Sequence, residues 1–279
     1  MSEPLTVVIT GATAGIGLES ALQIAAEGHR LVLVGRNPEK LARAAAEVHA
    51  VGAAGVDTVV ADYESLDSVR AAAKEIRALC PRIDVLVNNA GTVYASRTLT
   101  GDGYEATLQV NHLAGFLLTE ELKDVLVESA PARIVITAST GHYPGTLDFD
   151  DLGLEKGYSI MRAYSRSKLA NVLHARSLAA ELDGTGVTVN ALHPGSVATK
   201  IWSGAPWFAR PVLAVMKRWM RSPAEGGANI TYLAIDPAVE GRSGGYYDDD
   251  QLKEPSELAR DDQVGARLRE VSLEMVGLS

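Results

Sequence analysis

Residues 5–17 read Leu5-Thr-Val-Val-Ile-Thr-Gly11-Ala-Thr-Ala-Gly15-Ile-Gly17, and this stretch decides the fold. Its first half is a short run rich in β-branched residues, which is typical of a parallel strand buried on both faces. A glycine turn follows at once, and apolar residues at helical spacing then continue to Gly28. This order directs free backbone N–H groups and a helix dipole at an anion. We therefore predict a dinucleotide pyrophosphate site here, against the alternative of a purely structural turn.

Strand and helix patterns alternate along the rest of the chain, which predicts an α/β fold. Further strands are predicted over residues 30–34, 56–60, 83–87, 133–138, 187–192 and 244–247, and helices over 38–51, 65–79, 104–127, 163–182 and 222–234. The tail after residue 247 is polar and has no predicted element. We predict a single domain over residues 1–279, in which a loop-rich insert (141–159) forms a wall of the substrate cleft and residues 196–222 form a lid.

Composition excludes several classes of protein. The 279 residues carry a net charge of −9, which argues against a nucleic-acid partner. Cys80 is the only cysteine, so no intrachain disulfide can form, and we interpret it as structural. The six histidines show no metal-ligand spacing. The N-terminus is acidic, unlike a signal peptide, and no segment approaches about 18 consecutive apolar residues, so we expect a cytoplasmic protein without a transmembrane segment.

The end of the second predicted strand bears on the choice of dinucleotide. An NAD site usually has an acid there, about 20 residues after the glycines, that binds the ribose hydroxyls. This chain has Arg36 and Asn37 instead, with no acid until Glu39. A guanidinium suits a 2′-phosphate, so we predict NADP (NADPH), with NAD as the alternative. A solvated surface arginine is the structural interpretation of the same residue.

Other predicted strands also end in residues that a ligand could meet, because ligands of open α/β sheets bind at the carboxyl edge. Asp62 and Tyr63 follow the third strand, where the carboxylate could accept a hydrogen bond from adenine. The run 88–91, Asn-Asn-Ala-Gly, follows the fourth, and its small residues leave room for a ligand, although ordinary turn chemistry also explains the asparagines. Ser139 follows the fifth.

Two helical patterns carry candidate catalytic side chains. Asn111 is a poor interior helix residue, and its apolar neighbours indicate a local polar task. Tyr164 and Lys168 lie four positions apart and therefore share one helix face. A cation about 4 Å from a phenol is worth at most roughly 4 kcal/mol, or about three pK units, which would bring a phenol pKa of about 10 towards neutral. Tyr164 is thus a candidate general acid or base, and a solvated pair of helix neighbours is the alternative.

Residues 201–220 differ in composition from the rest of the chain, because all three tryptophans, Trp202, Trp207 and Trp219, lie there beside basic residues. One interpretation is the apolar lid; the other is a peripheral membrane contact through residues 202–219. Co-sedimentation with anionic vesicles would separate the two, because a lid alone leaves the protein in the supernatant.

Taken in chain order, these motifs resemble the short-chain dehydrogenase/reductase family. The resemblance rests on Thr10-Gly11-x-x-x-Gly15-x-Gly17, the run 88–91, Asn111, Ser139 and the Tyr-x-x-x-Lys pair, and it covers nearly the whole chain. The turn 35–37 and the run from Tyr164, reading Tyr-Ser-Arg-Ser-Lys-Leu-Ala-Asn, are similar to the retinol dehydrogenase and protochlorophyllide reductase-like branch. The resemblance implies a single-domain Rossmann fold with a doubly wound, seven-stranded parallel sheet flanked by helices.

The resemblance also implies a catalytic set of Asn111, Ser139, Tyr164 and Lys168. In that set Tyr164 exchanges the proton, Lys168 lowers the pKa of Tyr164 and holds the nicotinamide ribose, Ser139 binds the developing oxyanion, and Asn111 orders a water. The implied cofactor contacts are Gly11, Thr13, Ala14, Gly15, Ile16, Gly17, Arg36, Asn37, Asp62, Tyr63, Asn89, Ala90, Gly91, Tyr164, Lys168, Pro194, Gly195, Val197 and Thr199.

The implied function is NADP-dependent interconversion of an alcohol and a ketone or aldehyde on a small apolar substrate. The residues expected to line the cleft are Tyr143, Leu147, Leu152, Trp202, Trp207 and Phe208. Two departures stand out: Ala138 replaces the first serine of a pair, and Ala14 stands where many NADP-using members have a basic residue. The alternatives are a non-catalytic NADP-binding sensor or scaffold on the same fold and a reductase of a C=C bond. Members of the family commonly pair their subunits through helices, so the resemblance is compatible with a homo-oligomer.

Overall fold

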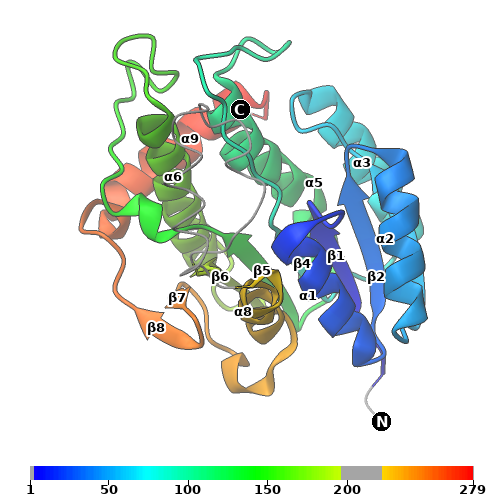
Figure 1. The fold of residues 1–279 in the computed structure, drawn as a ribbon. Helices are drawn as coiled ribbons and strands as arrows, with labels where there is room; N and C mark the ends of the chain where they lie inside the picture. The colour runs from blue at the N-terminus through cyan, green and yellow to red at the C-terminus, as the bar shows by residue number, and fades with distance from the viewer. Residues whose placement is uncertain (1–2, 196–221, 279) are drawn as a thin grey trace.

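An eight-stranded sheet runs through the molecule in the order β3-β2-β1-β4-β5-β6-β7-β8 (Figure 1). The structure, a computed structural model, describes residues 3–195 and 222–278. The strands are β1 (Thr6–Thr10), β2 (Arg30–Gly35), β3 (Gly55–Val60), β4 (Val85–Asn88), β5 (Ala132–Thr137), β6 (Val187–His193), β7 (Tyr246–Asp248) and β8 (Gln251–Lys253). The seven predicted parallel strands are confirmed; β8 was not predicted and pairs antiparallel with β7.

The sheet is doubly wound, as predicted, because the chain reverses direction at β1. It runs outward from β1 to β2 and β3, then returns to pair β4 with the other edge of β1. Ile9 of β1 lies opposite Val87 of β4, so both strands reach the same edge of the sheet. Ligands bind at such a reversal in open α/β sheets. The loops after β1 and β4 therefore start the candidate site.

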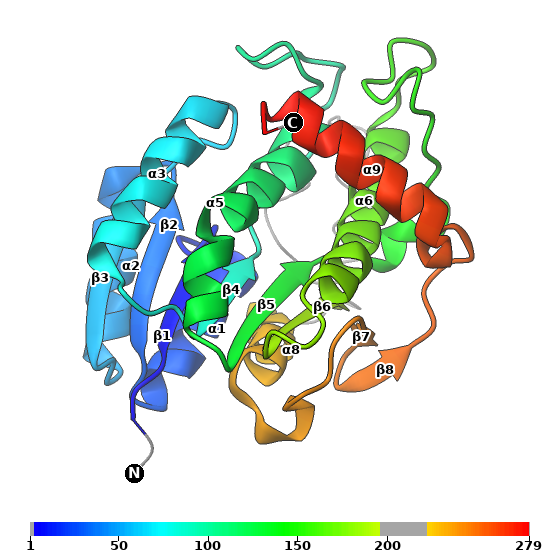
Figure 2. The same cartoon turned by 180° about the vertical axis from the view of Figure 1, so that it is seen from behind.

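Helices cover both faces of the sheet (Figures 1 and 2). One face carries α1 (Gly15–Ala26), α2 (Pro38–Ala50) and α8 (Pro223–Ile235); the other carries α3 (Leu66–Leu79), α5 (Ala114–Glu128), α6 (Ile160–Glu181) and α9 (Asp262–Met275). Successive strand residues point to opposite faces. Val7 and Ile9 accordingly belong to the core under α1, whereas Val8 belongs to the core under α3.

The helix predicted over residues 104–127 is interrupted in the structure. It consists of the short α4 (Ala106–Leu108), a π-helical turn η1 (Gln109–Leu113) and then α5. A π-turn inside a helix is rare and frequently lies at a functional site. Asn111 is the central residue of η1, so the local polar task expected for it coincides with a change of helix geometry.

The polar tail, for which the sequence predicted no element, contains β8 and then α9, which packs against α6 (Figure 2). The apolar residues Val264, Leu268, Val271 and Met275 do recur at helical spacing. Charged residues between them give the segment its polar composition. Short 3₁₀ turns, η5 (Pro237–Val239) and η6 (Leu258–Arg260), complete the C-terminal part.

Two smaller predictions agree with the structure. Ser222 caps α8, and with Glu225 it forms a complete capping box. Cys80 is buried at the C-terminal end of α3.

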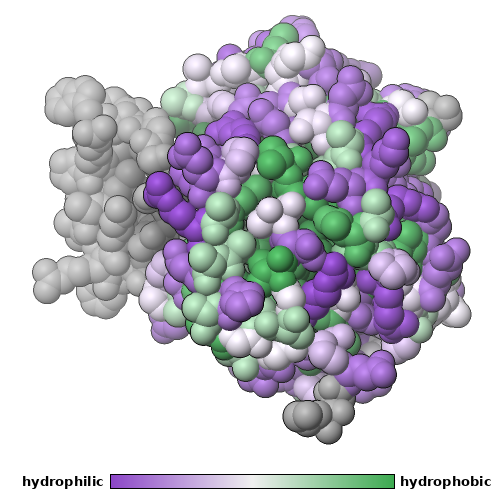
Figure 3. Space-filling model, turned by 90° about the vertical axis from the view of Figure 1, so that its right-hand side faces the viewer, coloured by the Kyte–Doolittle hydropathy of each residue, from purple (hydrophilic) through white to green (hydrophobic). Residues whose placement is uncertain are grey.

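Over residues 3–195 and 222–278, no helix combines the length and apolar character that crossing a membrane needs. On the side shown in Figure 3, hydrophilic side chains surround scattered apolar ones, which is ordinary for a protein surface.

Candidate active site

The glycine loop between β1 and α1 has the conformation that a phosphate needs. Gly11 and Gly15 have φ values of +67° and +58°, which favour glycine. A Cβ on Gly11 would lie 2.9 Å from Ala90 Cα, and one on Gly17 would lie 2.5 Å from the Gly11 oxygen. Ala14 is the N-cap of α1 and offers no side-chain oxygen to the first-turn N–H groups. These N–H groups can therefore bind a phosphate oxygen, so the loop fits a dinucleotide.

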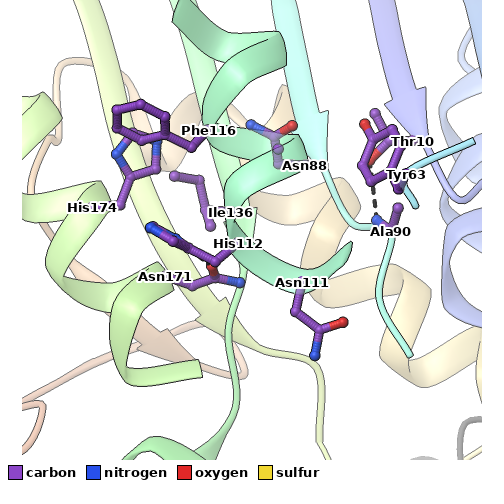
Figure 4. Close-up of a pocket in the computed structure, with 11 residues that line it drawn as sticks. Thr10, Tyr63, Asn88, Ala90, Asn111, His112, Phe116, Ile136, Asn171 and His174 are labelled. Carbon is purple, nitrogen blue, oxygen red and sulfur yellow. Dashed lines mark hydrogen bonds between the residues drawn. The ribbon is translucent and has the colours of Figure 1, made fainter. Parts of the chain in front are cut away.

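The hydroxyl of Thr10 ties the glycine loop to the end of β4. Its Oγ1 accepts hydrogen bonds from the N–H groups of Asn89 (2.9 Å) and Ala90 (3.0 Å), the second of which is dashed in Figure 4. The Asn89 amide donates to the Thr10 carbonyl at 2.9 Å. Thr10 was part of the predicted motif but had no predicted role. A buried hydroxyl on the last residue of an apolar strand was the available signal.

Arg36 lies at the end of β2, as predicted, but it already has an acidic partner. Its side chain is 66% exposed, and Nη1 lies 2.8 Å from Glu64 Oε1 and 4.0 Å from Asp62 Oδ1. The Tyr94 hydroxyl donates to the same Glu64 oxygen at 2.7 Å. The Asn37 side chain caps α2. A 2′-phosphate at this place would therefore share Arg36 with Glu64, a residue that the sequence did not single out.

Ser139 and Tyr164 face each other at the carboxyl edge of β5. Ser139 caps the 3₁₀ turn η2 (Thr140–His142), and its Oγ accepts a hydrogen bond from the Gly141 N–H at 3.0 Å. That contact uses one lone pair of the hydroxyl oxygen, and the hydroxyl proton can still donate to another acceptor. A Cβ on Gly141 would lie 2.9 Å from Tyr164 Cε1. Gly141, which was not predicted as a site residue, is what lets the phenol approach Ser139.

Lys168 and Asn111 complete the cluster from the neighbouring helices. The Lys168 side chain is buried, and Nζ donates to the Thr137 carbonyl at 2.9 Å and lies 5.8 Å from the centre of the Tyr164 ring. Asn111 Oδ1 accepts from the Thr92 N–H at 2.7 Å. A Cβ on Gly91 would lie 3.2 Å from Asn111 Oδ1 and 3.7 Å from Lys168 Nζ. The fold thus brings all four predicted catalytic side chains to one edge of the sheet.

Burial controls the charges in this cluster. It lowers the pKa of Lys168 to about 8, because an ammonium loses its hydration there. Burial raises the pKa of Tyr164, and a hydrogen bond with Ser139 acts in the opposite direction. In the protein alone the net direction for Tyr164 is upward, so a lowered phenol pKa through Lys168 stays a prediction.

A small cavity lies behind these residues, between η1, α5, α6 and the strand ends (Figure 4). Its volume is about 10 Å³, which is the space of a single water and far too small for an organic substrate. Within the described part of the chain, three buried atoms of lining residues, Tyr63 Oη, Asn88 Oδ1 and His174 Nε2, have no hydrogen-bond partner. The cavity is polar enough for one water, and the substrate must bind elsewhere.

The remaining predicted residues divide into three groups. Thr13, Ile16, Tyr63, Pro194 and Gly195 lie at or beside the ends of β1, β3 and β6, so they border the same edge. Among the predicted cleft residues, Tyr143 is exposed, Leu147 packs against the core and Leu152 is buried. Val197, Thr199, Trp202, Trp207, Phe208 and Trp219 lie outside the described residues.

The insert 141–159 is held by Arg166, which sequence reasoning missed. This side chain is only 3% exposed, and its guanidinium donates to the backbone carbonyls of Thr146 (3.1 Å), Leu152 (2.9 Å) and Asp151. An arginine between Tyr164 and Lys168 on a helix with a buried face was the signal. Arg166 lies on α6, the helix that also carries Tyr164 and Lys168, so its hydrogen bonds attach the insert directly to the site.

Three comparisons place these features among known proteins. Residues 5–206 match the sequence model described as short chain dehydrogenase. The chain is 41% identical over 287 residues to retinol dehydrogenase 14 of Mus musculus, covering 98% of this chain and 86% of that protein. It is 42% identical over 275 residues to a protein of Streptomyces sp. (strain C5) named as a daunorubicin C-13 ketoreductase, DnrU, covering 98% and 92%. A solved structure from Beutenbergia cavernae, described as an NAD(P)-dependent gluconate 5-dehydrogenase with NADP at low occupancy, superimposes with a TM-score of 0.73 at 29% identity, covering 89% of this chain and 96% of that one.

Proposed function

Because this chain belongs to the short chain dehydrogenase family, in its retinol dehydrogenase-like branch, we propose that it is an NADP-dependent enzyme for an apolar ketone, aldehyde or alcohol. Family membership makes it an oxidoreductase that acts on alcohols or carbonyls. The cofactor preference, the substrate and the part played by each residue are our proposal.

The observation that carries the proposal is the convergence of Ser139, Tyr164 and Lys168 around the space that Gly141 leaves open. Tyr164 donates the proton to the carbonyl oxygen in reduction and removes the alcohol proton in oxidation. Ser139 donates a hydrogen bond to the same oxygen, since the bond that its Oγ accepts from the Gly141 N–H holds the hydroxyl in place and leaves its proton available. A sensor or scaffold on the same fold has no need for this complete set.

The protein provides a distinct group for each part of the dinucleotide. The free N–H groups after Ala14 bind the pyrophosphate, Arg36 binds the 2′-phosphate, and Lys168 binds the nicotinamide ribose. When bound, the nicotinamide supplies or accepts the hydride. NADP bound to the Beutenbergia cavernae protein supports a dinucleotide in this fold, and Arg36 is our reason for choosing NADP over NAD.

Two features support a lipophilic substrate. The names of two relatives refer to retinol and to daunorubicin, which contain an apolar polyene chain and a polycyclic ring system, respectively. The insert 141–159, which Arg166 fixes beside Tyr164, provides one wall of the cleft in our proposal. The lid over residues 196–222, the membrane contact, the cytoplasmic location and a homo-oligomer stay predictions from the sequence.

Oxidation of NADPH and of NADH by the purified protein should be measured with a panel of lipophilic ketones and aldehydes, including retinal and a polycyclic ketone. We expect turnover with several of these carbonyls and a higher kcat/KM for NADPH. Chromatography of the products separates a reduced carbonyl from a reduced C=C bond. Failure of every carbonyl would overturn the proposed activity, and a preference for NADH would overturn the cofactor assignment.

A further inference from the structure

His142 is completely buried next to Ser139, and two hydrogen bonds determine its protonation. Its Nδ1 lies 2.7 Å from the Ser139 carbonyl oxygen, and the Ser256 N–H donates to its Nε2 at 3.1 Å. A carbonyl oxygen only accepts and a backbone N–H only donates. The ring must therefore carry a proton on Nδ1 and a lone pair on Nε2, which makes it the neutral Nδ1–H tautomer.

The surroundings of His142 keep the ring neutral and in place. The ring centres of Tyr143 and Tyr246 lie 4.2 Å and 4.7 Å from that of His142. Burial lowers the pKa of His142, so the neutral form is favoured. Because aromatic rings flank the imidazole, it has little freedom to rotate away from its two backbone partners.

These bonds anchor the short turn that carries the catalytic serine. Ser139 caps η2 and His142 ends it, and the Ser139 carbonyl accepts from both the His142 backbone N–H (3.0 Å) and Nδ1–H, so the imidazole reinforces the backbone bond that closes the turn. The Tyr143 hydroxyl donates to the Glu254 carbonyl at 2.9 Å, and Ser256 binds His142. The segment 254–256, more than a hundred residues away in the chain, thus holds the turn from outside.

We propose that His142 is a positioning residue that sets the orientation of Ser139 for catalysis. It acts through the Ser139 carbonyl and touches neither substrate nor cofactor. This inference rests on the proposed function, because it assigns His142 a part in the same reaction. The bond to Ser139 is the one that matters for turnover, whereas the bond to Ser256 attaches the turn to the C-terminal segment.

Two substitutions separate the bonds, because an Asn amide nitrogen reproduces Nδ1 and a Gln side-chain oxygen reproduces Nε2. His142→Gln keeps an acceptor for Ser256 but loses the donor to Ser139. We expect it to lower kcat by about 10-fold to 100-fold, with little change in KM or in the Kd for NADPH, since small displacements of a catalytic group cost rates of this order. His142→Asn keeps the donor and should rescue kcat to within about threefold of wild type.

Thermal unfolding supplies the control. Each variant loses one buried hydrogen bond, so a purely structural role predicts that their Tm values and kcat values fall together. Equal kcat in both variants, or a lower kcat in His142→Asn than in His142→Gln, would overturn the proposal. ¹⁵N NMR of the wild-type imidazole should find the neutral Nδ1–H tautomer. This measurement needs no substrate, so an Nε2–H tautomer would refute the inference even if the proposed activity failed.

Discussion

The phenol of Tyr164 is the group from which the reaction can be tested most directly. Tyr164→Phe removes the exchangeable proton and keeps the ring against Gly141. We expect turnover to fall by about 10²-fold or more, the range for loss of a general acid or base. The Kd for NADPH, measured by fluorescence titration, should stay nearly unchanged, since the variant retains the glycine loop, Arg36 and Lys168, which we propose bind the phosphates and the nicotinamide ribose. A variant that keeps most of its turnover would refute the role of Tyr164.

Glu64 is the residue most able to tune the cofactor preference, because its carboxylate lies 2.8 Å from Arg36 Nη1. A 2′-phosphate must compete with it for the guanidinium. Exposed ion pairs are worth about 0–1 kcal/mol, so the competition is weak but measurable. Glu64→Gln should raise the ratio of kcat/KM for NADPH to that for NADH by about threefold. Glu39→Gln, an exposed acid in the first turn of α2, serves as the control. An unchanged ratio in Glu64→Gln would argue against competition.

At the scale of elements, the crossing of α1 and α8 depends on Gly227. A Cβ there would lie 2.8 Å from both Glu19 Cβ and Ser20 N, and the second of these atoms belongs to the α1 backbone. Replacing a helical glycine by alanine normally stabilises by about 0.5–1 kcal/mol. We expect Gly227→Ala to destabilise by about 1–3 kcal/mol instead, because the helices must separate. Urea unfolding measures whether the substitution lowers or raises the free energy of unfolding.

A matched variant in the same helix calibrates that result. Ala228 is exposed in α8, so Ala228→Gly reports helix propensity alone and should cost about 0.5–1 kcal/mol. If Gly227→Ala proves stabilising by a similar amount, the close approach of the two helices is not rigid. Destabilisation by Gly227→Ala would establish that Gly227 is what allows α8 to pack closely against α1, the helix that follows the glycine loop.

At the scale of the whole molecule, His112 joins three parts of the fold. On η1, its Nδ1 lies 3.3 Å from Asn171 Oδ1 of α6 and its Nε2 lies 3.0 Å from Ser272 Oγ of α9. Burial lowers its pKa from 6.5 to about 4, and a weaker effect of the Asn171 hydrogen bond opposes this. Between these values the unfolded chain binds the proton and the folded protein does not. Stability is therefore lost as the pH falls from about 6.5 towards 4.

This linkage gives a measurable slope. Between pH 7 and pH 5 the free energy of unfolding should fall by about 2 kcal/mol through His112 alone. His112→Asn keeps a donor for Asn171 and removes the titration, so urea unfolding at the two pH values should show a smaller loss. Burial also lowers the pKa of His174, so some acid sensitivity should persist. His49→Asn, at the exposed end of α2, is the control and should lose as much free energy of unfolding between the two pH values as wild type does. If His112→Asn also loses as much as wild type, His112 is not the source of the acid sensitivity.

By itself the sequence determined the features that depend on neighbours in the chain. The β-branched run and the glycines after it specify a buried strand and a tight turn, and the i to i+4 spacing places Tyr164 and Lys168 on one helix face. Ser222 and Glu225 specify a capping box in the same way. Local conformational preferences and hydrophobic periodicity are sufficient for such features, and the alternation of strands and helices then leaves few topologies.

Tertiary structure alone decided which distant groups meet. Glu64 binds Arg36, Gly141 makes room for Tyr164, and Ser256 binds His142, and no periodic pattern relates these partners. The helix α9 was overlooked because its apolar positions are separated by charged residues, and its contact with α6 exists only after both have formed. The physical reason is that hydrogen bonds and packing depend on distances in space, which local conformational preferences do not specify. These distances are set only when the parallel strands pair and their carboxyl ends meet at one edge of the sheet.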